Sequence, residues 1–150
     1  MAKTALKLVL LCLLLNVVRY FVGAPLEAVT IMEPMHAPMS RYPDVFDTDF
    51  TRRDFTVSLG YNFAMWLVVT VVVHLLFPVL RGPAILRSLQ GFGLMALFFV
   101  SLAAVYMNHY TGPMRSFYAW SMVDALLVFT LLGLVNGVVY PWLFPECARV

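Results

Sequence analysis

Apart from Lys7 near the start of the first stretch, two charged side chains lie within apolar stretches of the sequence, where charged residues are rare, and both could take part in chemistry. Asp124 lies about seven residues into the apolar stretch 117–143, and Arg19 lies about one turn from the end of the stretch 5–22. An unpaired Asp near the centre of a membrane helix costs about 2.5 to 3.5 kcal/mol, so it has to face protein or water. We predict an Arg19–Asp124 pair, which is either an ion pair that locks two helices together or part of a ligand or proton site.

Further polar and aromatic side chains are expected at the same end of the helices as Asp124. Together with Arg19 and Asp124, the ligand-binding candidates are Tyr106, Asn108, His109, Arg115 and Tyr118, with Tyr61, Asn62 and Ser121 close by. Pockets between the helices of a bundle are common ligand sites. The alternative interpretation is a hydrated rim with ordinary hydrogen bonds.

His74 lies inside a second apolar stretch, 63–80. A bis-histidine haem would need another histidine at similar depth, but His109 is expected at the opposite end of the helices and His36 lies between the first two stretches. We predict a neutral His74 in a local hydrogen bond, with Thr70 one turn earlier as the candidate partner, rather than a proton relay. The sequence identifies no cofactor.

Residues 32–39 contain a cluster of soft metal ligands. The weak candidates for a metal site are Met32, Met35, His36 and Met39. Thioether and imidazole groups suit Cu(I). Because Met and Pro also pack in apolar segments and no second soft cluster exists, we expect no metal site.

Motifs typical of common enzyme families are missing from the sequence. It contains no P-loop, no G-x-G-x-x-G, no H-E-x-x-H and no G-x-S-x-G. Cys12 and Cys147 do not form the paired motif of a thiol-disulfide enzyme. The sequence therefore leaves open whether the protein is an enzyme.

Four apolar stretches define the elements that must position these residues. They are residues 5–22, 63–80, 91–107 and 117–143. Each approaches or exceeds the roughly 17 to 25 residues that cross a bilayer. Hydrophobic residues make up 62% of the chain and charged residues 12%, against about 45 to 50% and about 25% in soluble domains. We predict an all-α polytopic membrane protein, a four-transmembrane-helix bundle that forms one membrane domain over residues 1–150.

The connections between these stretches differ in length. The last two connections are short, so successive helices should be antiparallel neighbours. The first is a long extracytoplasmic loop over about residues 23–62, which is too short to fold alone and should lie across the helix ends or against a partner. Within it, Thr51 and Asp54 match a capping box, which suggests a start for the second helix ahead of its apolar stretch.

Loop charges give a weak indication of orientation. With both termini inside, five Lys and Arg lie on each side, but Arg52 and Arg53 belong to the long loop and count less. We predict an integral protein of the bacterial inner membrane with both termini cytoplasmic. Pro25 directly after Ala24 is a poor cleavage junction, so we expect the first helix to remain uncleaved.

The fourth helix carries a second contact face. Gly133 and Gly137 form a G-x-x-x-G pattern, which allows two helix backbones to approach closely, and Asn136 lies beside it. Contact with a partner chain is one possibility. We expect packing inside the same chain, with Asn136 forming a hydrogen bond between helices.

Two functions are consistent with these features. The first is a subunit or accessory component of a larger membrane complex, whose partners are the lipid bilayer and other membrane proteins or further copies of the chain. Small size, the lack of a catalytic constellation and the long loop favour it. The alternative is an outer-leaflet ligand-binding protein or enzyme that acts on a lipid, quinone or similar amphiphile through a polar pocket around Arg19 and Asp124. The net charge of +2 gives no indication of a nucleic-acid partner.

Overall fold

The protein is helical throughout the part of the chain that the structure describes. The computed structural model describes residues 2–46, 49, 51–109 and 112–148, and these residues form helices and connections without a strand. Among these described residues, four helical segments are long and apolar enough to cross a membrane: Ala2–Thr30, Arg52–Leu76, Ala84–Met107 and Met114–Leu143. The predicted four-helix membrane architecture is confirmed.

The first span is longer than its apolar stretch predicted. Helix α1 (Ala2–Val18) continues through a π-helical turn, η1 (Arg19–Gly23), into α2 (Ala24–Thr30). In this turn the Ala24 N–H donates to the carbonyl of Arg19, five residues back. Pro25 has no N–H to donate, but it lies in the first turn of α2, where its ring is tolerated. The helix therefore passes the proline, and the loop predicted to begin at residue 23 is helical there.

Capping and proline residues set the ends of the other helices. Helix α3 (Met32–Arg41) is followed by α4 (Arg52–Leu76), which begins at the predicted capping box: the Asp54 N–H donates to Thr51 Oγ1 at 3.3 Å, and the Thr51 N–H donates to Asp54 Oδ2 at 3.0 Å. Helix α4 ends just before Pro78, four residues earlier than predicted. Helices α5 (Ala84–Met107), α6 (Gly112–Leu143) and α7 (Pro145–Ala148) complete the chain.

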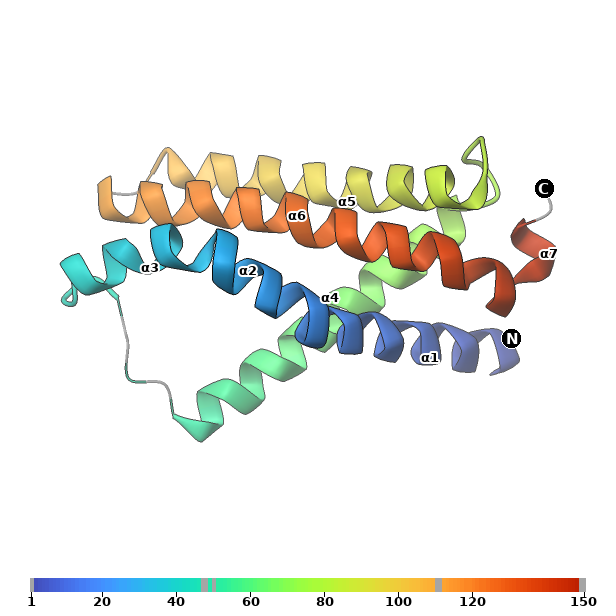
Figure 1. The fold of residues 1–150 in the computed structure, drawn as a ribbon, viewed down its shortest axis with the longest axis horizontal. Helices are drawn as coiled ribbons and strands as arrows, with labels where there is room; N and C mark the ends of the chain where they lie inside the picture. The colour runs from blue at the N-terminus through green and yellow to red at the C-terminus, as the bar shows by residue number, and fades with distance from the viewer. Residues whose placement is uncertain (1, 47–48, 50, 110–111, 149–150) are drawn as a thin grey trace.

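Helices α5 and α6 lie side by side and antiparallel, with the first span along the other flank of α6 (Figure 1). Helix α4 crosses behind them diagonally and contacts both α1 and α5. Helix α3 packs on the first half of α6, and the two chain termini lie at the opposite end of the bundle. On the side away from the termini, α3 and the first half of α6 pack together, while the first turns of α4 diverge from them.

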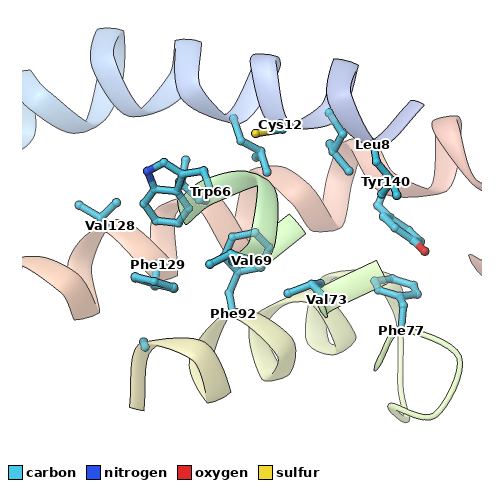
Figure 2. Close-up of a cluster of buried hydrophobic side chains, with 14 of the residues drawn as sticks. Leu8, Cys12, Trp66, Val69, Val73, Phe77, Phe92, Val128, Phe129 and Tyr140 are labelled. Carbon is cyan, nitrogen blue, oxygen red and sulfur yellow. The ribbon is translucent and has the colours of Figure 1, made fainter. Parts of the chain in front are cut away.

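The core forms where α4 crosses the other helices. Trp66, Val69 and Val73 recur at helical spacing along α4 and are buried, as is Phe77 directly after its last residue (Figure 2). The ring of Trp66 packs at 4.9 Å, centroid to centroid, against Phe129 of α6. Large apolar side chains elsewhere point outward, as on the outer face of α5, where Phe98 is 68% exposed. Because such a face is stable against acyl chains and not against water, it indicates the lipid side of the helix.

The glycine face of α6 packs against α5 of the same chain, as predicted. The buried Asn136 side chain donates from Nδ2 to Ser88 Oγ at 2.8 Å. A Cβ atom placed on Gly133 would lie 3.2 Å from Phe92 Cβ, and one on Gly137 would lie 2.6 Å from Ile85 Cα. These glycines therefore allow the two backbones to approach closely.

We expect Gly137→Ala to lower the free energy of unfolding by about 1 to 3 kcal/mol, because the new methyl group meets helix backbone that cannot easily move. Thermal unfolding in detergent, followed by circular dichroism, measures the change. The matched control is Gly93→Ala on α5, where nothing lies within 4 Å of the added Cβ and alanine improves helix propensity. Equal melting temperatures for the two variants would contradict close packing at Gly137.

Candidate ligand-binding site

An ion pair within the first span forms one wall of the candidate site. Arg19 Nη1 lies 2.7 Å from Glu27 Oε1, and the two side chains are only 16% and 4% exposed. Arg19, Gly23 and Glu27 follow one another at four-residue intervals. A Cβ on Gly23 would lie 3.4 Å from Arg19 Nη1, so the glycine leaves room for the arginine to extend along the helix. The π-helical turn that begins at Arg19 is of a kind found frequently at functional sites.

The predicted partner of Arg19 was Asp124, and the structure corrects this assignment. Glu27 is the residue in ion-pair contact with Arg19. Asp124, on α6, lies within hydrogen-bonding reach of the Glu27 carboxyl, and its carboxyl interacts electrostatically with the Arg19 guanidinium. The site is therefore a cluster of one guanidinium and two carboxyl groups. Apolar-stretch analysis assigned Glu27 to a loop, because it ended the first helix at residue 22.

A cavity of about 290 Å³ opens beside this cluster, between α3, α4, α5 and α6. We call it the polar chamber. Its polar lining consists of Arg19, Asn62, Trp66, Ser121 and Asp124. The remaining lining residues are Met35, Met65, Phe99, Phe117, Ala125, Val128 and Phe129. The chamber thus combines a few polar groups with apolar walls, as small-molecule sites commonly do.

Several polar atoms around the polar chamber are buried without a hydrogen-bond partner among the described residues. They are Asn62 Oδ1, Trp66 Nε1, Asp124 Oδ1 and Glu27 Oε1, the last of which is in ion-pair contact with Arg19. Trp66 is only 2% exposed, and Figure 2 shows its indole nitrogen on the same side as the chamber residue Val128. Leaving a buried donor or acceptor unsatisfied costs about 1 to 3 kcal/mol. Two of these acceptors and the one donor belong to residues that line the polar chamber.

The structure brings part of the predicted site together. Arg19, Asn62, Ser121 and Asp124 line the polar chamber, although the Ser121 hydroxyl donates at 2.9 Å to the carbonyl of Phe117. The predicted residues outside its lining are Tyr61, Tyr106, Asn108, His109, Arg115 and Tyr118. Tyr106, Asn108, His109 and Arg115 are exposed near the ends of α5 and α6. These residues lie at the predicted end of the bundle, but their side chains are not on the helix faces that line the chamber.

Three residues important to the site were missed by sequence reasoning. Glu27 could have been found from its spacing of eight residues from Arg19 with a glycine midway. Trp66 was not among the predicted site residues, yet it is buried in the core and lines the chamber. Met35 was considered only as a metal ligand, and it contributes apolar lining from α3.

His74 has a different partner from the one predicted. Its Nδ1 lies 2.7 Å from the hydroxyl of Tyr140 on α6, whereas the Thr70 hydroxyl donates to the carbonyl of Trp66 at 2.7 Å. The predicted Thr70–His74 contact is wrong because Thr70 bonds back to its own helix, as Thr commonly does in apolar surroundings. His74 therefore joins α4 to α6 at the end of the bundle near the termini.

The weak metal candidates lie on α3 and face different surroundings. Met32, Met35 and Met39 are partly buried, while His36 is exposed. Met35 accepts a weak contact from the Ser121 hydroxyl at 3.8 Å. Within the described ranges, no group of three His, Cys, Asp or Glu side chains is placed to hold a metal ion.

The fold and the polar chamber define a class, a four-span helical membrane protein with a partly polar pocket between its spans. Comparison with protein-family models, curated proteins and solved structures gave no match. The chemistry of the site therefore has to be read from its own geometry.

We expect Arg19→Met to lower the free energy of unfolding by about 3 kcal/mol, because it leaves two neighbouring carboxyl groups without their cation. Adding Glu27→Gln should recover much of this loss, since the amide removes one of the two acids. Detergent unfolding of the two single variants and the double variant completes a thermodynamic cycle. Additive effects of the two substitutions would show that the pair contributes no coupling.

Proposed function

We propose that this protein binds the polar end of an amphiphile, of the lipid or quinone class, in the polar chamber beside Arg19 and Asp124. The observation that carries the proposal is that three residues lining one cavity each hold a buried polar atom without a hydrogen-bond partner among the described residues: Asn62 Oδ1, Trp66 Nε1 and Asp124 Oδ1. A structural role alone would favour apolar side chains at these positions, because each unsatisfied group destabilises the fold. A bound polar group would satisfy all three.

A contrast within the same bundle supports this proposal. Between α5 and α6, the polar pair Asn136 and Ser88 is fully buried and hydrogen-bonded at 2.8 Å. The chain thus pairs buried polar groups where their role is to join helices. Around the polar chamber it places an indole donor and two acceptors without such partners. Such a difference is expected of a binding site that trades stability for function.

We propose further that the chamber lies toward the outer leaflet of a bacterial inner membrane, with both termini cytoplasmic. The termini lie at one end of the bundle, and Lys3 and Lys7 are near the N-terminus. Cytoplasmic ends of membrane helices are enriched in Lys and Arg. Arg19 and Asp124 belong to the half of the bundle away from those ends.

We expect Asp124→Asn to abolish retention of the amphiphile. The substitution replaces one acceptor oxygen of the carboxyl group by an NH2 donor, so the side chain has fewer positions that can accept a hydrogen bond from the ligand. Native mass spectrometry of protein released from nanodiscs of a bacterial polar-lipid extract measures the retained mass. The melting temperature of delipidated protein should stay equal or rise, since an unsatisfied buried carboxyl is removed.

The matched control for this substitution is Glu33→Gln, the same carboxyl-to-amide change at an exposed position on α3. Retention should be unchanged in that variant. A lower melting temperature for Asp124→Asn with unchanged retention would instead identify the Asp124 carboxyl as structural and refute the proposed function.

We propose as a second candidate the predicted role as a subunit of a larger membrane complex, supported by a different observation. Every residue from Thr51 to Tyr61 is exposed, and Figure 1 shows these first turns of α4 diverging from the other helices. Phe55 is among the large apolar side chains on this segment. A helix segment exposed on all sides gains no packing energy from the rest of its own chain.

If this segment binds another membrane protein, extraction in mild detergent should yield a particle larger than a monomer, and Phe55→Ser with Leu59→Ser should reduce it to a monomer. Light scattering with correction for detergent measures the protein mass. Deleting the whole of residues 23–62 is a poorer test, because it also removes Glu27 and α3. A monomer from the unmodified chain would refute the subunit role.

A further inference from the structure

An apolar groove of about 440 Å³ runs between α4 and α5 next to the polar chamber. Ala64 and Val68 line it from α4, and Phe98 and Leu102 line it from α5. Val68 and Phe98 are among the most exposed side chains of these helices, so this groove faces outward, where the bilayer lies. We call it the α4–α5 groove.

The α4–α5 groove and the polar chamber adjoin each other. Met65, Phe99 and Phe129 line both of them. Two of these side chains are aromatic, and the third is a methionine, which adapts its shape easily. These three side chains are therefore all that separates a hydrocarbon chain in the groove from the polar chamber, and a shift of their rotamers would connect the two spaces.

We propose that the protein binds an uncharged, hydroxyl-bearing amphiphile, with its hydroxyl head in the polar chamber and its hydrocarbon chain in the α4–α5 groove. The ligand enters sideways from the bilayer between α4 and α5. This inference rests on the proposed function, and it adds the chemistry of the head, the position of the chain and the route of entry.

The charges around the chamber determine which head fits. Arg19 is already in contact with Glu27, and Asp124 adds a second carboxyl beside them. Because the Arg19 guanidinium is already paired with the Glu27 carboxyl, the cluster has no unpaired positive charge to attract a phosphate or carboxylate head.

The unsatisfied atoms indicate a hydroxyl head. Asp124 Oδ1 and Asn62 Oδ1 can each accept a hydrogen bond, and the Trp66 indole N–H can donate one. A hydroxyl group both donates and accepts, so a head with two hydroxyls satisfies all three atoms. Glycerol monoesters and quinols share this chemistry.

The walls of the groove determine what the chain can be. Its described lining consists of aliphatic, aromatic and methionine side chains, among which Tyr61 carries a hydroxyl group. Its volume lies within the range of about 300 to 1,000 Å³ that ligand pockets occupy. An alkyl or isoprenoid chain meets no polar group there that it would leave unsatisfied.

The test uses Trp66 as the reporter, since its ring lies in the chamber wall. In a Trp120→Phe, Trp142→Phe background, Trp66 remains as the chain's single tryptophan. The protein is placed in nanodiscs and titrated with 9,10-dibromostearoyl glycerol, whose bromine atoms quench nearby indole fluorescence. The same brominated chain is then presented as an ionised fatty acid and as a fatty amine.

We expect saturable quenching by the glycerol ester, with an apparent affinity at least tenfold weaker for the fatty acid and for the amine. Val68→Phe, which narrows the α4–α5 groove, should lower the apparent affinity for the glycerol ester at least tenfold. Val105→Phe is the matched control, because Val105 is similarly exposed on α5 but does not line the groove. Competition by decylhydroquinone then distinguishes a quinol head from a glycerol head.

Each opposite result would overturn a stated part of the inference. Equal or tighter binding of the fatty acid or the amine would refute the uncharged hydroxyl head and leave the proposed function standing. Equal effects of Val68→Phe and Val105→Phe would refute the groove. Quenching that never saturates would show contact with bulk lipid only, and it would refute both the hydroxyl head and the groove. Failure of the proposed function would be seen separately, as unchanged lipid retention in Asp124→Asn.

Discussion

A guanidinium group inside a bilayer has to find its counter-charge within the protein, and much of this structure is arranged around that need. Arg19 lies 2.7 Å from Glu27. The contact requires the first helix to continue past Pro25, which it does through a π-helical turn and α2. It also requires space along the helix, which Gly23 provides. Helix α3 then returns to pack on α6 and closes one side of the polar chamber.

Two kinds of helix contact divide the bundle. Between α5 and α6, glycines allow close approach, and the polar pair Asn136 and Ser88 is satisfied within the chain. Where α4 crosses diagonally, aromatic side chains such as Trp66 and Phe129 fill the core, and the helices separate toward the end away from the termini. The polar chamber and the α4–α5 groove lie along this second contact. Close packing on one side thus accompanies open space on the other.

The sequence was sufficient for the architecture because its signals are local. Four apolar stretches predict four spans, the Thr51–Asp54 capping box predicts where α4 begins, and the spacing of Gly133 and Gly137 predicts a close helix contact. Each of these features acts within one or two turns of helix, where residue spacing and geometry correspond directly. The helix ends were less well predicted, since hydropathy reports where lipid begins and not where hydrogen bonding stops.

By itself, the sequence determined that the chain is a helical membrane protein and that Arg19 and Asp124 need polar surroundings, because the cost of charge in hydrocarbon depends on residue type. Only the tertiary structure decided which partners they find. Glu27, Asn62 and Trp66 come from segments whose rotation and crossing angle depend on how whole helix faces pack together. The same reason explains why His74 contacts Tyr140 rather than its near neighbour Thr70. A pairing between helices is set by the sum of many contacts, and no single stretch of sequence contains that sum.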